Sequence, residues 1–322
     1  MGNEKMIKVI MDCDPGHDDA IALLLASRAD NIQILGVTTV QGNSELRYTS
    51  KNARRVLDYA DVTDIDVYAG CPKPMMKEQY RQTGIAIHGE DGLGGPHIPD
   101  SITPIKEKHA VNFIIDTLRA SDEKITLIPT GPLTNIATAF IMAPDIKDKI
   151  EKIVIMGGAV YTEGNVNTSN EFNLFLDPEA AKIVLNSGCD VYLNTLDVSM
   201  KAVFMKEDVE TLRAQGDKIS VIVAELLDFF GITHERLFNF YSIPIHDALC
   251  VGMLIDDTLI EYEHVWADIS TKDELTAGEV VADIWHLTDK KPNCYIAKKV
   301  DREKFVKMVC EHMKKPYVSK YV

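Results

Sequence analysis

An apolar run is followed at once by four carboxylates in the stretch Val9-Ile10-Met11-Asp12-Cys13-Asp14-Pro15-Gly16-His17-Asp18-Asp19-Ala20. Residues 6–11 predict a buried strand, and residues 18–29 predict a helix. The carboxylates therefore lie between the carboxyl end of a strand and the amino end of a helix. Open α/β sheets bind their ligands at such positions.

Like charges this close repel one another by roughly 1 kcal/mol per pair at ~4 Å in water. The sequence therefore predicts a cation among them. Oxygen ligands without His or Cys at ligand spacing favour Ca²⁺ or Mg²⁺ over zinc. One alternative is that Asp18 and Asp19 only cap the helix while Asp12 and Asp14 are solvated, although capping needs one carboxylate and not four.

Length and composition predict one large domain over residues 1–322, because 46% of the residues are hydrophobic and no Pro/Gly/Ser-rich linker divides the chain. The net charge of −15 argues against nucleic acid and anionic membranes as partners. No apolar leader and no run of ~18 apolar residues occurs, so we expect a cytoplasmic protein. The six cysteines lack CxxC spacing, which predicts free thiols.

Strand-like and helix-like segments alternate along the first two thirds of the chain, which predicts a doubly wound α/β fold with a mostly parallel sheet and helices on both faces. The predicted strands are 8–12, 32–40, 67–69, 125–130, 153–157 and 191–196. The predicted helices are 18–29, 44–60, 109–120, 133–143 and 178–186.

A different pattern follows from about residue 205. It predicts helices at 206–214, 219–239 and 245–254, strands at 279–285 and 293–300, and a last helix at 302–314. We expect these C-terminal helices to cover the ligand edge of the sheet. Trp285, in the strand-like part, is expected in the core. Two long loops, 71–103 and 158–173, are predicted to be functional because loops of this length in compact domains usually are.

The motif Asp12-x-Asp14-Pro15-Gly16-x-Asp18-Asp19-Ala20 resembles the N-terminal signature of the nucleoside hydrolases, the inosine-uridine preferring family. Later segments resemble the family in the same order across nearly the whole chain. In that family the motif binds one Ca²⁺ and activates a water. The resemblance implies hydrolysis of the N-glycosidic bond of ribonucleosides to ribose and free base, for nucleoside salvage. It implies pyrimidine substrates such as uridine and cytidine, with inosine as a further one, and a homotetramer or homodimer.

The resemblance also implies the metal ligands. The Ca²⁺ would be held by three carboxylates and one backbone carbonyl, from Asp14, Asp19, Asp247 and Thr130. Asp14 would also act as the catalytic general base. Thr130 lies in Pro129-Thr130-Gly131-Pro132, which on its own is typical either of a structural turn or of an exposed carbonyl that calcium accepts.

The ribose would be held by polar side chains and one methionine, which the resemblance places at Asp18, Asn43, Met156, Asn165, Glu171 and Asn173. Residues 163–173 are dense in amides, which suit sugar hydroxyls. Asn-rich loops are also common as plain turns, so the spacing alone leaves both interpretations open.

Two histidines would serve the leaving base, with His246 or, for some bases, His88 protonating it or donating a hydrogen bond. His88 lies in a glycine-rich loop. Phe230, His234 and Phe238 recur at helical spacing and are interpreted as lining the nucleobase side, although such a stripe is equally typical of a core. His17 receives no role.

Two other functions remain open at this point. Asp12-x-Asp14 also resembles the nucleophile and acid pair of aspartyl phosphotransferases, but Gly16 replaces the usual Thr or Val and the carboxylates of Asp18 and Asp19 would have no role. The second alternative is a Ca²⁺-dependent nucleoside or ribose binding module without turnover.

Overall fold

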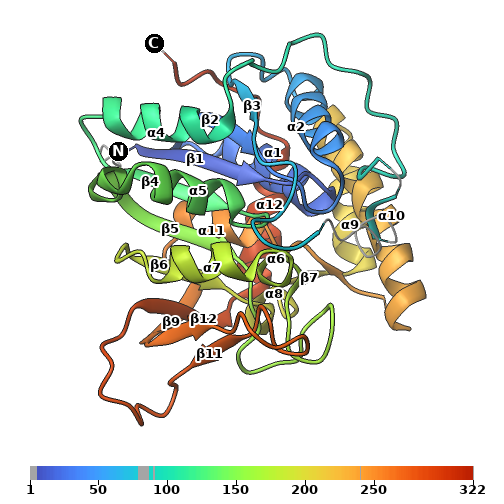
Figure 1. The fold of residues 1–322 in the computed structure, drawn as a ribbon. Helices are drawn as coiled ribbons and strands as arrows, with labels where there is room; N and C mark the ends of the chain where they lie inside the picture. The colour runs from blue at the N-terminus through green and yellow to red at the C-terminus, as the bar shows by residue number, and fades with distance from the viewer. Residues whose placement is uncertain (1–5, 79–86, 90, 240, 322) are drawn as a thin grey trace.

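The computed structural model describes residues 6–78, 87–89, 91–239 and 241–321. Its centre is an eight-stranded sheet whose strands come from the first, middle and last parts of the chain (Figure 1). The strand order is β3 (Val67–Ala69), β2 (Ile32–Thr39), β1 (Ile7–Cys13), β4 (Ile125–Pro129), β5 (Ile150–Met156), β6 (Val191–Asn194), β12 (Cys294–Val300) and β9 (Ile260–Val265). Neighbours run parallel except β12 and β9. The predicted mostly parallel sheet is confirmed.

Helices pack on both faces of the sheet (Figure 1). One core cluster contains side chains from α1 (His17–Arg28), α2 (Leu46–Tyr59), α10 (Lys218–Phe238), α11 (Ala248–Ile255) and α12 (Arg302–Met313). The other contains side chains from α4 (Ala110–Ala120), α5 (Thr134–Met142) and α7 (Pro178–Leu185). In β1, Val9 and Met11 belong to the first cluster and Ile10 to the second, because successive strand residues point to opposite faces.

Shorter elements complete the described fold. They are η1 (Pro144–Lys149), α6 (Phe172–Leu176), α8 (Leu196–Ser199), α9 (Lys206–Ala214), the antiparallel pair β7 (Val203–Phe204) and β8 (Ile243–Pro244), and the antiparallel pair β10 (Ala267–Ile269) and β11 (Val280–Ala282). The strand predicted at 279–285 is thus shorter and pairs with β10 outside the main sheet. Trp285 follows it and is 77% exposed, so its predicted core position is wrong.

The order in which strands join the sheet reverses between β1 and β4. β1 pairs on one side with β2 and on the other with β4, and Asp12 lies opposite Pro129 in the parallel register. The loops that follow these strands therefore meet at one edge. Such a reversal opens a crevice at the carboxyl ends of the strands, which is where open α/β sheets bind ligands.

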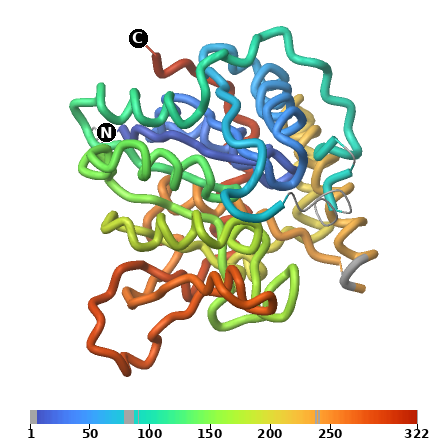
Figure 2. Tube along the Cα trace, in the orientation of Figure 1, coloured from blue at the N-terminus to red at the C-terminus, as the bar shows by residue number. Residues whose placement is uncertain are grey.

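The beginning of β1 and the described part of the C-terminal tail lie on the same side of the molecule (Figure 2). The C-terminal tail runs back against β2, where the amide of Gln33 donates to the carbonyl of Lys320 over 3.0 Å. Among the described residues, no helix combines the length and the apolar character needed to cross a membrane.

Candidate active site

Asp14 follows β1 and is completely buried. Its Oδ2 accepts a hydrogen bond from the backbone N–H of Asn43 over 2.6 Å, whereas its buried Oδ1 has no hydrogen-bond partner within the described structure. A Cβ on Gly42 would lie 2.0 Å from Oδ2, and one on Gly131 would lie 2.4 Å from Oδ1. The carboxylate therefore fits only because both neighbours are glycines. Burial raises its pKa well above the usual range, and the charge of Asp19 adds to this.

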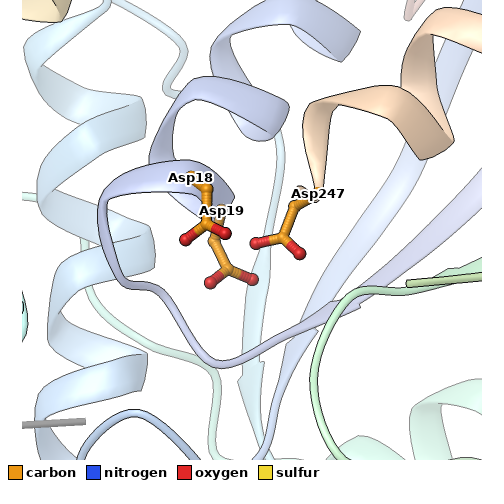
Figure 3. Close-up of side chains that lie close together, drawn as sticks. All are labelled: Asp18, Asp19 and Asp247. Carbon is orange, nitrogen blue, oxygen red and sulfur yellow. The ribbon is translucent and has the colours of Figure 1, made fainter. Parts of the chain in front are cut away.

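Three further carboxylates point toward one another, two from the first turn of α1 and one from the residue before α11 (Figure 3). Asp18, Asp19 and Asp247 each offer an oxygen within 4.8 Å of the others, and all three are buried. Burial raises the pKa of Asp18 to about 8 and raises the pKa of Asp247 well above the usual range. Removal from water and mutual repulsion both disfavour the charged forms here.

Asp19 also caps the turn before α1. Its Oδ2 accepts from the backbone N–H of Gly16 over 3.1 Å, and its Oδ1 accepts from the hydroxyl of Thr130 over 2.8 Å. The capping interpretation therefore holds for Asp19. It does not account for Asp18, whose Oδ1 is buried without a hydrogen-bond partner in the part of the chain that is described.

The arrangement fits a hard cation. Buried carboxylates are stable as ions only when they are paired or coordinate a metal, and none of the ion pairs among the described residues involves Asp14, Asp18, Asp19 or Asp247. The donor set is all oxygen, as calcium and magnesium prefer. Two of the predicted ligands, Asp19 and Asp247, belong to the tight group of three carboxylates, and Asp18 is its third member.

A pocket opens beside these carboxylates, and Asp18 and Asp247 form part of its lining. It is lined by Asp18, Asn43, Ile87, His88, Thr130, Met156, Asn165, Val166, Glu171, Phe172, Asn173, Phe230, His246 and Asp247. α10 supplies Phe230, and the segment before α11 supplies His246 and Asp247. The C-terminal region therefore contributes to covering this edge of the sheet, as predicted.

One wall of the pocket is held by Glu171 and Asn173 at the start of α6. Glu171 accepts hydrogen bonds from the backbone N–H groups of Asn173, Leu174 and Gly158, over 2.9, 3.2 and 3.1 Å. Burial nevertheless raises its pKa to about 7. Asn173 donates to the carbonyl of Thr130 over 2.7 Å, which ties the loop after β4 to this wall. Both side chains are therefore held rigidly.

The pocket lining also includes the two predicted histidines. His246 Nδ1 lies 2.7 Å from the hydroxyl of Ser199, and burial lowers its pKa to about 3. His88 Nδ1 lies 2.9 Å from Nδ1 of His17, and burial lowers the pKa of His88 well below the usual range. At neutral pH both rings are therefore uncharged.

Buried carboxylates beside a pocket at the strand reversal indicate an enzyme active site. A comparison with known protein families agrees with this geometry. Residues 9–307 match the model of the family described as "Inosine-uridine preferring nucleoside hydrolase". The chain belongs to this family. It is therefore a ribonucleoside hydrolase, an enzyme that cleaves N-glycosidic bonds, and the phosphotransferase and non-catalytic alternatives are not supported.

Individual nucleoside hydrolases resemble the chain over nearly its whole length. A "Pyrimidine-specific ribonucleoside hydrolase RihA" of Shigella boydii serotype 4 (strain Sb227) is 40% identical over 309 residues, 96% of this chain and 98% of the relative. One of the same name from Shewanella sp. (strain MR-7) is 41% identical over 306 residues, 95% of each chain. A solved purine-preferring ribonucleoside hydrolase from Gardnerella vaginalis superposes with a TM-score of 0.89 at 31% identity, covering 95% of this chain and 99% of the other.

The structure of this nucleoside hydrolase brings most predicted site residues together. Asp14 and Asp19 lie buried beneath the pocket, and the residues predicted to hold the ribose all line it. Three residues at helical spacing were predicted to line the nucleobase side. Phe230 lines the pocket, whereas His234 is buried but does not line it. The side chain of Phe238 lies outside the described part of the chain.

Several residues of this nucleoside hydrolase site had no predicted role. His17 contacts His88, the glycines 42 and 131 enclose Asp14, and the apolar side chains of Ile87, Val166 and Phe172 line the pocket. Their positions inside or beside the quoted motifs were the available signal. Val166 and Phe172 lie in the amide-rich loop, and Ile87 precedes His88. Each of these apolar residues is thus next in sequence to a predicted site residue, which indicated that it could line the same pocket.

Proposed function

We propose that the chain hydrolyses pyrimidine ribonucleosides, uridine and cytidine, to ribose and free base with the help of one Ca²⁺, and that it serves nucleoside salvage. The observation that carries this is the buried Oδ1 of Asp14, which has no hydrogen-bond partner among the described residues and lies near three buried carboxylates, two of which line the pocket. The pyrimidine preference is supported by the names of relatives at 40 and 41% identity.

Asp14, Asp19 and Asp247 would hold the cation with the carbonyl of Thr130, and the position of Asp18 supports a contact from it as well. The Thr130 carbonyl accepts one hydrogen bond, from Asn173, and keeps a second lone pair. When bound, Ca²⁺ supplies Lewis-acid chemistry, because it orients a water molecule and makes that water more acidic.

Asp14 acts as the general base in this proposal. Its Oδ1 is free to accept the proton of the attacking water, while the N–H of Asn43 fixes the other oxygen. A carboxylate whose pKa is raised by burial accepts a proton more readily at neutral pH. The hydroxyl of the water then bonds to the anomeric carbon as the bond from that carbon to the base nitrogen breaks.

The ribose is held by Asp18, Asn165, Glu171 and Asn173 while positive charge develops at its anomeric carbon. Negative carboxylates near the ring stabilise that charge. The electron pair of the broken bond leaves with the base, which the neutral ring of His246 stabilises through a hydrogen bond. His88 also lines the pocket and contacts the base.

The test is base and reducing-sugar release from uridine, cytidine, inosine and adenosine, before and after chelation and with Ca²⁺ or Mg²⁺ returned. We expect release from uridine and cytidine above the purine nucleosides, loss on chelation, and recovery with Ca²⁺. Recovery only with Mg²⁺ would contradict the calcium assignment. Faster release from inosine and adenosine would contradict the pyrimidine preference.

A further inference from the structure

His17, the first residue of α1, joins the acidic turn to the glycine-rich loop. Its Nδ1 lies 2.9 Å from Nδ1 of His88, and its Nε2 lies 2.8 Å from the carbonyl oxygen of Gly94. The two rings stack with centroids 5.2 Å apart. His17 is completely buried and does not line the pocket, whereas His88 does. A single side chain thus contacts both a pocket residue and the loop that carries it.

Gly16, the residue before His17, shapes the same contact. A Cβ on Gly16 would lie 2.7 Å from two ring atoms of His88, closer than real Cβ contacts. The backbone conformation at Gly16 is extended and needs no glycine for its own sake. The ring of His88 therefore packs directly on the turn that carries the carboxylates, against Gly16 and beside His17.

The hydrogen-bond partners determine which nitrogen carries each hydrogen. The carbonyl of Gly94 can only accept, so Nε2 of His17 is the donor there. In a neutral His17 ring, Nδ1 then has a lone pair, and Nδ1 of His88 must carry the hydrogen between them. Both ring nitrogens of His17 contact uncharged partners, a carbonyl and a second imidazole, whereas a buried charged ring would need a carboxylate partner, so the ring is neutral.

One other contact reaches the same nitrogen. The backbone N–H of His17 lies 3.3 Å from Nδ1 of His88, farther than the 2.9 Å between that nitrogen and Nδ1 of the His17 ring. A hydrogen on that nitrogen excludes a bond from this N–H. The alternative, two lone pairs facing each other over 2.9 Å, would be repulsive. Nε2 therefore remains as the nitrogen of His88 that is available to a ligand, and it bears a lone pair.

We propose that His17 is a positioning residue for His88, orienting its ring and leaving Nε2 to accept a hydrogen bond from an N–H group of the nucleobase. This rests on the proposed function, in which His88 contacts the base. His17 touches neither the substrate nor the carboxylate cluster in this role and acts through His88. Its ring also stacks on Phe230 with centroids 5.8 Å apart, a contact that a phenylalanine at position 17 keeps.

A double-mutant cycle tests the proposal. We would measure kcat and KM on uridine and cytidine for the wild type, His17→Phe, His88→Ala and the double variant. Phenylalanine keeps a ring in the stack but removes both polar contacts. We expect His17→Phe to lower kcat/KM about 10- to 100-fold, as the loss of an orienting partner typically does. In the His88→Ala background, His17→Phe should lower kcat/KM by less than about twofold, because the effects of substitutions at coupled residues are not additive.

An equal loss in both backgrounds, or no loss in the wild-type background, would overturn the proposal. Because His17 adjoins Asp18, Ca²⁺ affinity is measured by calorimetry for each variant, and a tenfold weaker affinity in His17→Phe would also overturn it. The matched control is His312→Phe in α12, where a buried ring bonds the carbonyl of Met308. It should change kcat/KM by less than about twofold; a loss as large as that of His17→Phe would overturn the specific role.

A spectroscopic measurement keeps the test independent of whether His17→Phe folds. Nitrogen-15 shifts of the wild-type histidines report which ring nitrogens carry hydrogen. We expect His88 to be protonated at Nδ1 and not at Nε2, and the reverse pattern would overturn the proposal. If the wild type released no base from any nucleoside, the proposed function would fail instead, and the nitrogen-15 pattern would still decide the contact between the two rings.

Discussion

The backbone N–H of Asn43 donates to Oδ2 of Asp14 over 2.6 Å, which leaves Oδ1 as the oxygen of that carboxylate without a partner in the described structure. Asparagine at position 14 can keep the first contact, since its side-chain oxygen still accepts from Asn43. It cannot accept a proton as a base. We expect Asp14→Asn to lower kcat on uridine by at least about 10²- to 10⁴-fold, the usual contribution of a general base.

The measurement is single-turnover base release, with the thermal unfolding midpoint and nucleoside binding recorded beside it. Binding that survives while turnover is lost supports the assignment of Asp14 as base. Turnover within tenfold of the wild type would exclude it.

Gly131 leaves room for the same carboxylate. In Gly131→Ala the new methyl group would meet Oδ1 of Asp14 at 2.4 Å, so the side chain of Asp14 must move. We expect a loss of kcat comparable to that of Asp14→Asn. The control is Gly216→Ala, where nothing lies within 4 Å but φ is +74°. It should cost about 1–2 kcal/mol of stability through backbone strain and leave kcat unchanged.

Glu171 uses both carboxylate oxygens on backbone N–H groups. Glu171→Gln turns one of them into an NH₂ group that faces donors, whichever way the amide points. We expect a loss of about 1–3 kcal/mol in the free energy of unfolding, the cost of unsatisfied buried groups, and a raised KM for ribonucleosides. Urea unfolding measures the change in the free energy of unfolding, and steady-state kinetics measure the change in KM. Glu163→Gln, at an exposed position of the same loop, serves as the control and should be neutral in both measurements.

The raised pKa values predict how the chelated protein responds to pH. Asp18 has a folded pKa of about 8, and Asp12 and Glu171 about 7, all above their unfolded values near 4. The stability that these groups contribute is present below about pH 4 and is lost as the pH rises through the folded values. Between pH 6.5 and 8.5 the chelated protein should therefore show a falling melting temperature.

This window avoids the opposite effect of the buried histidines. His17 and His246 have folded pKa values of about 4 and 3, below the unfolded value of 6.5, so they cost stability only below about pH 6.5. Calcium, which favours the ionised carboxylates, should raise the melting temperature more at pH 8.5 than at pH 6.5. A melting temperature independent of pH in the chelated protein, or equal stabilisation by Ca²⁺ at both pH values, would argue against a cation at the carboxylates.

His246 is expected to affect bases unequally. Its Nδ1 contacts Ser199, and its ring lines the pocket, so His246→Ala removes a group that stabilises the leaving base. Bases that leave poorly need that group most, because a hydrogen bond to developing negative charge typically contributes about 10²- to 10³-fold. The measurement compares kcat on uridine, cytidine and inosine for the wild type and His246→Ala. Small and equal losses of kcat on all three nucleosides would contradict the role of His246 in stabilising the leaving base.

The acidic motif could be placed from local sequence alone. A buried strand, a proline-glycine turn and a helix start put Asp12, Asp14, Asp18 and Asp19 in one place, and the structure agrees. Asn43 and His88 lie within a hundred positions of this motif, but most of the remaining site residues, Thr130 and Asp247 among them, lie farther away in sequence. Thr130 and Asp247 could be tied to the motif only through the family resemblance, because no local pattern states which distant loops meet at a strand reversal.

Other contacts could not be anticipated from the residues. His17 and His88 are 71 positions apart, and no local pattern in the sequence indicates that they meet. Trp285 was expected in the core because it follows a strand-like run, but β11 ends at Ala282 and the indole is exposed. Apolar side chains indicate burial only when the backbone continues along the sheet.

The apolar wall of Ile87, Val166 and Phe172 is the part of the pocket best suited to redesign. Hydrogen bonds tie Asp19 to the turn before α1 and to Thr130, and tie His17 to His88, so changing one of these residues disturbs several functions at once. Among the bonds described, the side chains of these three residues join none of those networks. A library restricted to the three positions should therefore shift the choice of nucleoside while sparing the hydrolytic step, which makes them the starting point for directed evolution of this enzyme.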